Sequence, residues 1–477
     1  MTKTSDIVAT APVDVVIMAA GRGTRMKSRL PKVLHLLAGR ALLAHVVDTA
    51  AQLSARQVIV VSGHGAPEVE AAGAGMTSAA ASFDLKFVRQ EPQLGTGHAV
   101  QQAAPLLADD GMVLVLSGDV PLTEAGTLQH LLQASAGERL ALLTIDLPDP
   151  SGYGRIVRRG DAVQAIVEQK DASAAQRLIT EVYSGIMVAP ARWLKVWLAR
   201  LDNANAQGEF YLTDVVKFAV ADGVPVVAHT ITDAVQVAGV NSPQQLAQLE
   251  RLVQGRLAQQ LLEQGVRLLD PARLDVRGRL SCAQDVVIDV NCVFEGDVRL
   301  GEGVQVGAHC VIKNATIGAG AVIYPFSHIE GGQAGSKEAV EVGAGALIGP
   351  FARLRPGARL GAQVHIGNFV EVKNSSLAKG AKANHLAYLG DATVGERVNF
   401  GAGSITANYD GANKHRTVIE ADVHVGSNCV LIAPLTLGAG GTVGGGSTLT
   451  KDTAPLALSV ARARQLSIPN WKRPSKK

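Results

Sequence analysis

Residues 288–312 read IDVNCVFEGDVRLGEGVQVGAHCVI, and every sixth residue of this stretch is aliphatic or Phe. The period continues to Leu449 through one-residue slips and irregular stretches, which chance clustering in a Gly-rich linker would not produce. Six residues match neither the period of a helix nor that of an alternating strand, but they are a known repeat length of β-helices. We therefore predict a parallel β-helix in which three hexads close a triangular coil, with aliphatic residues inside and small residues at the corners. The predicted inward residues are Ile288, Phe294, Leu300, Val306, Ile312, Ile317, Ile323, Ile329, Val342, Ile348, Leu354, Leu360, Ile366, Val372, Val394, Phe400, Ile419, Val425, Leu431, Leu437, Val443 and Leu449.

Length and composition limit the class of protein. With 477 residues the chain is too long for one ordinary core, so we expect two domains. A hydrophobic content of 47% and a charged content of 18% are typical of a folded soluble protein, and a net charge of +3 gives no argument for a nucleic-acid partner. No apolar run approaches the roughly 20 residues of a membrane span. Residues 1–11 lack a secretion signal, so we expect a cytoplasmic protein that does not insert into a membrane.

The four cysteines all lie in the repeat region and show no metal-ligand spacing. Three of them, Cys292, Cys310 and Cys429, follow an inward position by four residues, where the coil needs a small side chain. We interpret them, together with Cys282, as packed thiols in a reducing compartment.

The first half of the chain alternates apolar runs with helical segments, which indicates a parallel sheet with helices on both faces, a Rossmann-like α/β domain. We assign it to residues 1–240. Ser242 and Pro243 then form the start of a linker helix, which ends near Gly265. Residues 266–477 form the second domain and its tail. The predicted strands are Val13–Ala19, Gln57–Val61, Leu85–Val88, Met112–Leu116, Leu140–Ile145, Val226–Thr230 and Val235–Gly239, and the predicted helices include Leu42–Leu53 and Gly97–Leu107.

A Gly-rich turn directly follows the first predicted strand. Gly21 and Gly23 can expose backbone N–H groups that bind phosphates. Met26 replaces the third glycine of a dinucleotide-binding motif. Arg25 and Lys32 add two cations, which suits a triphosphate better than a nicotinamide cofactor.

The motifs around this turn resemble those of sugar-nucleotide pyrophosphorylases. Together with the hexad repeats, they make the whole chain from about Val13 similar to the family of bacterial bifunctional glucosamine-1-phosphate N-acetyltransferases/N-acetylglucosamine-1-phosphate uridylyltransferases. That resemblance implies a nucleotidyltransferase domain followed by a left-handed parallel β-helix of hexapeptide repeats. The motifs in the first domain are Ala19-Ala20-Gly21-x-Gly23-Thr24-Arg25-Met26, Pro31-Lys32, Gln90, Leu94–Ala99, Ser117–Leu122, Gly152–Ile156, Val167–Lys170 and Gly239–Asn241.

The resemblance also implies residue roles in the first domain. Arg25 and Lys32 would act in catalysis, and Asp119 and Asn241 would hold Mg²⁺ by their oxygens. Without the surrounding motif, Asp119 could equally be a strand-end cap, and Glu168 could be a surface carboxylate. The implied substrate-binding residues are Met18, Ala19, Ala20, Gly21, Lys32, Gln90, Gly95, Thr96, Ser117, Gly118, Asp119, Gly154, Glu168, Tyr183 and Asn241.

One position departs from the family pattern. Similar enzymes carry Asn where this sequence has Tyr183. A tyrosine cannot reproduce a compact amide contact to the sugar. The selectivity for the sugar is therefore less defined by the sequence than nucleotide binding.

Interruptions of the hexad pattern mark candidate functional regions of the second domain. We expect the ladder of inward residues to be disrupted between Lys373 and Asp391, and a polar loop to leave the coil at residues 408–414. A third insert, residues 331–341, carries Lys337. Acetyl transfer to a sugar amine needs a base, and His385 titrates in a suitable range. A lone His in a β-helix is more often structural, so its neighbours decide the interpretation.

The motifs Leu354-Arg355-Pro356, Glu371-Val372-Lys373, His385-x-x-Tyr388 and Asn408-Tyr409 match the acetyltransferase motifs of the family. The resemblance implies that His385 is the general base and that acetyl-CoA is a co-substrate. It also implies a homotrimer in which the acetyl-CoA site forms between chains. The residues implied to bind glucosamine 1-phosphate are Arg355, Lys373, Tyr388 and Asn399, and those implied to contact acetyl-CoA are Ala402, Asn408, Tyr409, Ser427, Gly445 and Arg462.

These observations favour a two-site enzyme with small-molecule substrates. It would acetylate glucosamine 1-phosphate and then transfer UMP from UTP to the product N-acetylglucosamine 1-phosphate, releasing pyrophosphate. One alternative is a single-activity pyrophosphorylase whose β-helix serves only oligomerisation or regulation. A non-enzymatic subunit with a degenerate nucleotide site is a further alternative, against which Arg25, Lys32, Asp119 and Asn241 argue.

Overall fold

The chain folds into two compact units, and the boundary lies between Leu252 and Val253. The computed structural model describes residues 11–73, 75–76, 83–333 and 336–475. The boundary falls within helix α8 (Pro243–Glu263), which the sequence assigned to a linker. Ser242 caps this helix by accepting a hydrogen bond from the Gln245 amide at 3.2 Å, as its sequence predicts.

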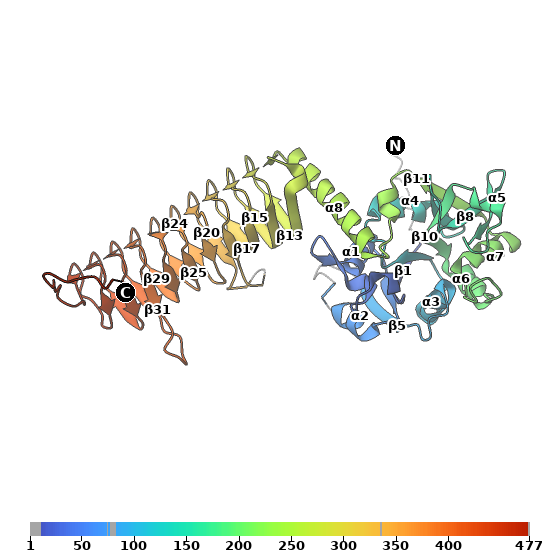
Figure 1. The fold of residues 1–477 in the computed structure, drawn as a ribbon. Coiled ribbons are helices and arrows are strands. Elements are labelled where there is room, and N and C mark those ends of the chain that lie inside the picture. Colours follow the sequence, from blue (N-terminus) through green and yellow to red (C-terminus); the bar gives the residue numbers. More distant parts are fainter. Residues whose placement is uncertain (1–10, 74, 77–82, 334–335, 476–477) are drawn as a thin grey trace, which may run out of the picture. The chain divides into compact units, whose positions relative to one another are not determined.

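The first unit is built on a nine-stranded sheet in which β11, β7, β10, β6, β1, β4 and β5 are neighbours in that order (Figure 1). Four of its strand pairs are parallel, as predicted. The other four are antiparallel, because β10 runs antiparallel to β6, β7 and β8, and β8 and β9 form a hairpin beside it. The strands are β1 (Val13–Met18), β4 (Gln57–Ser62), β5 (Asp84–Arg89), β6 (Met112–Ser117), β7 (Leu140–Asp146), β8 (Gly154–Arg159), β9 (Ala162–Val167), β10 (Glu181–Pro190) and β11 (Val226–Ile231).

Helices cover both faces of this sheet because its strands are apolar on both sides. Along β1, Val15 and Ile17 pack on one face and Val16 on the other, and all three are fully buried. One face is covered by α1 (Leu42–Ala51), α2 (Ala66–Gly73) and α4 (Ala125–Ser135), and the other by α3 (Thr96–Ala103), α6 (Ala191–Ala199) and α7 (Val215–Ala221).

Two predictions for this unit were wrong. The sheet is mixed rather than parallel, because β10 runs antiparallel to its neighbours and β8 and β9 form an antiparallel hairpin. The predicted strand Val235–Gly239 contains instead the 3₁₀ turn η5 (Ala234–Val237), whose start is capped by the Asp233 carboxylate accepting from the Val235 amide at 3.0 Å. The Val235 amide therefore has a local hydrogen-bond partner and does not need one on a neighbouring strand.

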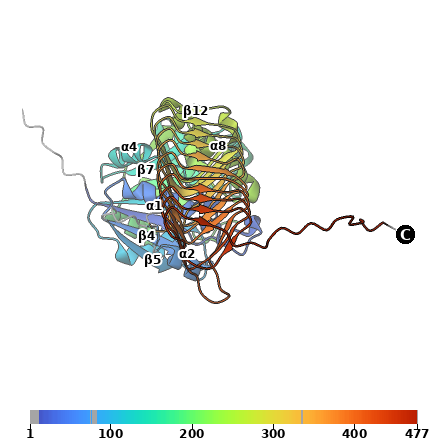
Figure 2. The same ribbon diagram turned by 90° about the vertical axis from the view of Figure 1, so that its left-hand side faces the viewer.

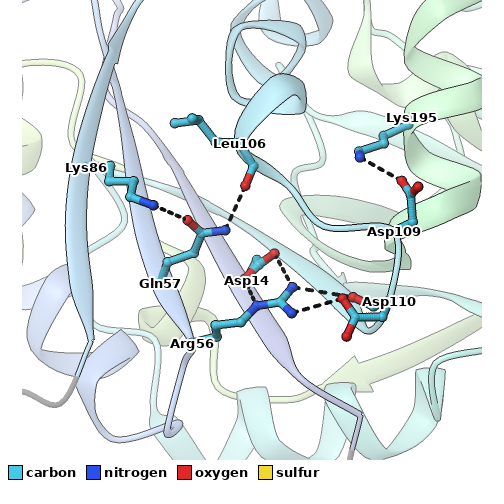
Figure 3. A network of polar contacts seen from close by, with 8 residues as sticks. All are labelled: Asp14, Arg56, Gln57, Lys86, Leu106, Asp109, Asp110 and Lys195. Carbon is cyan, nitrogen blue, oxygen red and sulfur yellow. Dashed lines mark hydrogen bonds and ion pairs between the residues drawn. The ribbon is translucent and has the colours of Figure 1, made fainter.

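A buried carboxylate joins the first two strands of the sheet (Figure 3). Asp14 on β1 is fully buried, and its two oxygens accept from the Arg56 guanidinium at 2.9 and 2.7 Å. Arg56 also donates to Asp110, which is largely exposed. The Asp14 charge is thus compensated where water does not reach it.

The second unit is a left-handed parallel β-helix, as predicted. Its short strands pair in parallel with those of the next coil, so that like positions stack along the axis; for example, Ile348 pairs with Ile366 (Figures 1 and 2). Every predicted inward residue is buried, which confirms the hexad pattern. The first ladder contains β12 (Arg267–Leu268), β14 (Val287–Ile288), β16 (Gln305–Val306), β18 (Val322–Ile323), β21 (Leu347–Ile348), β24 (His365–Asn368), β27 (Lys382–His385), β30 (Asn399–Phe400), β33 (His424–Val425), β36 (Thr442–Val443) and β38 (Leu458–Ser459).

The other two ladders share long strands at their beginning. Strand β17 (Val311–Ile317) pairs with a strand of each ladder, so it runs around one corner of the coil. Before it lie β13 (Leu274–Cys282) and β15 (Cys292–Leu300). The second ladder contains β19 (His328–Glu330), β22 (Arg353–Leu354), β25 (Glu371–Lys373), β28 (Tyr388–Gly390), β31 (Ile405–Ala407), β34 (Val430–Ile432) and β37 (Thr448–Leu449). The third contains β20 (Val340–Val342), β23 (Arg359–Leu360), β26 (Ser376–Leu377), β29 (Ala392–Val394), β32 (Thr417–Ile419) and β35 (Leu435–Leu437).

The structure corrects one prediction about the coils and supports another. The ladder isn't disrupted between Lys373 and Asp391, because Leu377, Ala383 and Leu389 continue it as buried inward residues on β26, β27 and β28. A slip in register and an alanine at an aliphatic position hid this continuity. Residues 408–416 do leave the coil, between β31 and β32 (Figure 1). Cys292, Cys310 and Cys429 are buried free thiols, as predicted.

Candidate active sites

A cavity of about 570 Å³ opens at the carboxyl ends of β1 and β6 in the first unit. This is the edge at which ligands bind in open α/β sheets. It collects predicted residues from segments far apart in the sequence. The predicted residues that line it are Met18, Ala19, Ala20, Gly21, Lys32, Gln90, Gly95, Thr96, Ser117 and Asp119.

The Gly-rich turn after β1 forms one wall of this cavity. Gly21 is exposed, and a Cβ added to it would meet no atom within 4 Å, so the backbone there is open to a ligand. Gly23 has a φ of +58°, and an added Cβ would lie 2.8 Å from the Lys32 Cβ. The turn therefore packs directly on Lys32. Arg25, predicted to be catalytic, is exposed on the 3₁₀ turn η1 (Thr24–Met26) and is not among the lining residues.

Lys32 lies between the two side chains predicted to bind Mg²⁺. Its ammonium forms an ion pair with Asp119 Oδ2 and donates to Asn241 Oδ1 at 3.1 Å. Ser117 Oγ donates to the other oxygen of Asp119 at 2.6 Å. Two oxygens from residues far apart in the sequence, Asp119 and Asn241, thus both contact the Lys32 ammonium. A carboxylate and an amide oxygen are a donor set that fits Mg²⁺, which takes its remaining ligands from water and phosphates.

Hydrogen bonds between side chains and backbone groups hold the part of the cavity that is lined by Gln90, Gly95 and Thr96. The buried Gln90 side chain donates to the Gly95 carbonyl at 2.9 Å, and Thr96 Oγ1 accepts from the Leu212 amide at 3.1 Å. Gly95 has a φ of +110°, and an added Cβ would lie 2.6 Å from the Phe210 carbonyl oxygen, so glycine is required. Gly118, also predicted to bind substrate, donates its amide to the Met18 carbonyl at 2.9 Å.

A second pocket of about 190 Å³ shares Met18 and Thr96 with the first, so the two are adjacent. Gly154 and Glu168, which the resemblance implied to bind the sugar, line it together with Tyr183, the position that departs from the family pattern. Burial raises the pKa of Glu168, although Thr213 Oγ1 donates to the carboxylate at 3.0 Å and opposes the shift.

Tyr183 stands out among these residues. Its side chain is buried, and its hydroxyl has no hydrogen-bond partner among the described residues. Burial, with a smaller effect of the Glu168 charge, raises the pKa of Tyr183 well above its usual value. An unsatisfied buried hydroxyl costs stability unless a ligand pairs with it.

His385 lies at a corner between the first two ladders of the β-helix. It ends β27 and is exposed to solvent, so it is not sealed inside the coil. Tyr388 begins β28 just beyond the corner residue Leu386, whose φ is +51°. The predicted general base His385 and Tyr388, predicted to bind glucosamine 1-phosphate, therefore flank one corner.

The predicted acetyl-CoA residues Ala402, Ser427 and Gly445 form a column that continues from His385. The amide of Gly403 donates to the His385 carbonyl at 3.3 Å, and those of Asn428 and Gly446 donate to the Ala402 and Ser427 carbonyls at 2.8 Å. Each column residue thus lies one coil beyond the last. Arg462, at the end of the column, donates to the Gly445 carbonyl.

Arg355 and Lys373 lie beside each other at the carboxyl ends of the neighbouring strands β22 and β25, since the Arg355 amide donates to the Val372 carbonyl at 2.8 Å. Lys414, from the loop at 408–416, is close to Lys373 and is the main cause that lowers its pKa, before burial and Arg355. Three cationic side chains therefore lie together here, and the Glu371 carboxylate accepts from Arg355 at 2.8 Å. Sequence analysis missed Lys414, although it lies in the predicted loop. Asn399 lies on the first ladder, with its side-chain nitrogen 3.3 Å from His424 Nε2.

Asp391 is a second residue that sequence analysis missed. Its buried carboxylate accepts hydrogen bonds from the Asn374 and Asn408 amides. It therefore anchors Asn408 at the base of the loop. Tyr409, the next residue, is 62% exposed, and its hydroxyl donates to the Gly411 carbonyl at 2.6 Å.

A nucleotide-sized cavity on an α/β sheet and a β-helix with a polar column define a two-domain transferase. A family model for the MobA-like NTP transferase domain matches residues 15–207. The "Bifunctional protein GlmU" of Albidiferax ferrireducens is 81% identical over 464 residues, which cover 97% of this chain and 100% of that protein. The proteins of the same name from Polaromonas naphthalenivorans and Acidovorax ebreus are 73% and 71% identical, with 98% and 97% of this chain and 98% of each protein covered.

The chain therefore belongs to the GlmU family of bifunctional proteins. It is a uridylyltransferase and acetyltransferase of UDP-N-acetylglucosamine biosynthesis, and its substrates are small sugars and nucleotides. The alternative of a single-activity pyrophosphorylase is not favoured. Among the described residues, no helix is long and apolar enough to cross a membrane.

Proposed function

We propose that the two activities use two separate sites of this chain. Uridylyl transfer takes place in the cavity at the sheet edge of the first unit, and acetyl transfer at the His385 corner of the β-helix. The observation that carries the first half is the position of Lys32 between Asp119 and Asn241. The exposure of His385 beside a column of predicted acetyl-CoA residues supports the second half.

In the first site, Asp119 and Asn241 would hold Mg²⁺, which would supply charge neutralisation for the phosphates. Lys32 pairs with the phosphates, and Arg25 reaches them from the turn after β1. The backbone at residues 18–21 holds uridine together with Gln90, Gly95 and Thr96, and Ser117 lies beside them. Gly118 binds the sugar.

The adjacent pocket binds the sugar phosphate in this proposal. Gly154, Glu168 and Tyr183 contact the N-acetylglucosamine ring there. Holding the sugar phosphate in line with the α-phosphate makes the attack effectively intramolecular. The new bond joins the sugar phosphate oxygen to the α-phosphorus, and pyrophosphate leaves with the electron pair of the broken P–O bond.

In the second site, His385 takes a proton from the amine of glucosamine 1-phosphate as the nitrogen attacks the thioester carbonyl. The C–N bond forms, the C–S bond breaks, and the leaving CoA sulfur takes the proton from His385 and departs as a thiol. Arg355 and Lys373 hold the sugar phosphate, while Tyr388 and Asn399 hydrogen-bond the sugar. Ala402, Asn408, Tyr409, Ser427, Gly445 and Arg462 bind acetyl-CoA.

We further propose a homotrimer that acts in the cytoplasm. His385, Tyr409 and Arg462 are exposed on the outside of the coil, which supports a neighbouring chain as the other wall of the site. Buried free thiols support a reducing compartment.

Two substitutions test the separation of the sites. With glucosamine 1-phosphate, acetyl-CoA, UTP and Mg²⁺ supplied, thiol and pyrophosphate release are followed separately. His385→Ala should lower thiol release by about 10²–10⁴-fold and leave uridylyl transfer to added N-acetylglucosamine 1-phosphate intact. Asp119→Ala should lower pyrophosphate release by at least about 10²-fold and leave acetyl transfer intact. Loss of both activities in either folded variant would contradict two separate sites, and a normal rate in Asp119→Ala would remove Asp119 from metal binding.

A further inference from the structure

One contact to His385 belongs to a residue with no role in the sites described so far. Asn368 lies one coil before His385, and its side-chain oxygen is 2.7 Å from His385 Nδ1. We infer that Asn368 is a positioning residue that fixes the orientation and tautomer of the His385 ring. The inference rests on the proposed role of His385 as the base of acetyl transfer.

The fold places these two residues against each other. Strands β24 and β27 pair in parallel with Asn368 opposite His385, and neighbouring strands lie about 4.8 Å apart. Both residues directly precede a left-handed corner residue, Phe369 at φ +57° and Leu386 at φ +51°. The Leu386 amide donates to the Asn368 carbonyl at 3.0 Å. The two backbones therefore take the same path, and the side chains leave them in the same direction.

The contact determines which ring nitrogen carries the proton. An amide oxygen can only accept a hydrogen bond, so the Nδ1 atom of His385 must donate. A neutral imidazole has one N–H, and its lone pair is then on Nε2. Nε2 is the atom that remains free to accept a proton from a sugar amine. Asn368 thus orients the His385 ring by accepting a hydrogen bond from Nδ1. Metal-binding histidines are oriented in the same way, by an acceptor on the ring nitrogen that does not bind the metal.

An amide differs from a carboxylate at this position because it carries no charge. A carboxylate would favour the protonated ring, which cannot act as a base. The other titratable groups near this corner include Lys382 on the same strand, His365 on β24, and Tyr388 on β28 with Glu371 opposite it on β25. His424 lies beyond Asn399 on the first ladder. Burial, Lys382 and His385 lower the pKa of His365. Asn368 therefore holds the ring without adding a negative charge.

The experiment compares Asn368→Ala and Asn368→Asp in the full chain. We expect Asn368→Ala to lower kcat for acetyl transfer about 10–100-fold, with KM for both substrates within about threefold of the wild type. We expect Asn368→Asp to shift the acid limb of the pH profile of acetyl-transfer kcat/KM to higher pH, by roughly one unit. A merely structural asparagine would not move this limb. Uridylyl transfer measured on the same preparations is the control for folding, and it should equal the wild type in both variants.

The outcomes separate this inference from the proposed function. A normal kcat in Asn368→Ala together with an unshifted profile in Asn368→Asp would overturn the positioning role. If His385→Ala, assayed in parallel, retained acetyl transfer, the assignment of the base itself would fail instead. A fall in uridylyl transfer along with acetyl transfer in Asn368→Ala would show general misfolding and also count against a local role.

Discussion

The two candidate sites are built in opposite ways. In the first unit, side chains from distant segments converge on a cavity of about 570 Å³ that one chain encloses. In the second unit, the residues repeat along the outside of a prism, and His385 and Tyr409 are exposed. A cavity needs only its own chain to surround a substrate, whereas a convex surface needs a second body. The comparison therefore predicts that the two activities respond differently to dissociation, mutation and pH.

Dilution is the most severe test of this difference. If a neighbouring chain completes the acetyltransferase site, the specific activity for acetyl transfer should fall by at least about tenfold once the oligomer dissociates. Uridylyl transfer per chain should stay constant, because its cavity lies within one unit. Both rates are measured across a concentration series, with the mass in solution determined by sedimentation. Equal acetyl transfer by monomer and oligomer would remove the contrast.

Stability should also separate the two units. Asp14→Ala removes the buried partner of Arg56, which is itself partly exposed and keeps Asp110, and should lower the free energy of unfolding of the first unit by about 1–3 kcal/mol. Asp110→Ala removes the exposed partner of the same arginine and should cost less than about 1 kcal/mol. Urea unfolding followed by both activities checks this. Acetyl transfer should survive at urea concentrations that abolish uridylyl transfer in Asp14→Ala, and simultaneous loss would show that the units unfold together.

A smaller effect of pH is expected in the first unit. Because burial raises the pKa of Glu168 in the folded state, the folded carboxyl holds its proton more tightly than the unfolded one. Stability from this group is therefore present at acid pH and is lost as pH rises from the ordinary carboxyl pKa to the raised value. Glu168→Gln should match the wild-type Tm at low pH and exceed it by up to about 4 °C at neutral pH. A difference in Tm that is the same at every pH would contradict the shift. The KM for the sugar phosphate should rise in this variant if Glu168 contacts the sugar.

The β-helix could be predicted almost completely from the sequence because its rule is local. Each inward position recurs after six residues, so Ile348 or Val425 can be placed without knowledge of any distant partner. The error between Lys373 and Asp391 came from the same source: Ala383 fills an inward position with a smaller side chain, and the pattern alone does not show that the coil continues.

The sheet was harder to predict because strand pairing is not local. Strand β10 pairs with β6 and β7, and nothing in its own residues states its direction. The candidate site shows the same limit. Motif resemblance indicated Asp119 and Asn241, but the position of Lys32 between them depends on the tertiary fold. Lys414 and Asp391 were missed since neither has a feature in the sequence that distinguishes it from other polar loop residues.

The column that begins at Asn368 and passes through His385, Ala402 and Ser427 to Gly445 has residues at fixed distances from one another. Each coil advances it by one inter-strand spacing, so His385 and Gly445 are separated by three spacings, or about 14 Å. This length can change only in whole steps, because a partial coil would turn inward residues to the solvent. Deleting or inserting one complete coil between them would change the reach of the site by about 4.8 Å while keeping every corner geometry. Adding or removing whole coils would thus adapt the distance between His385 and Gly445 to a longer or shorter thioester substrate.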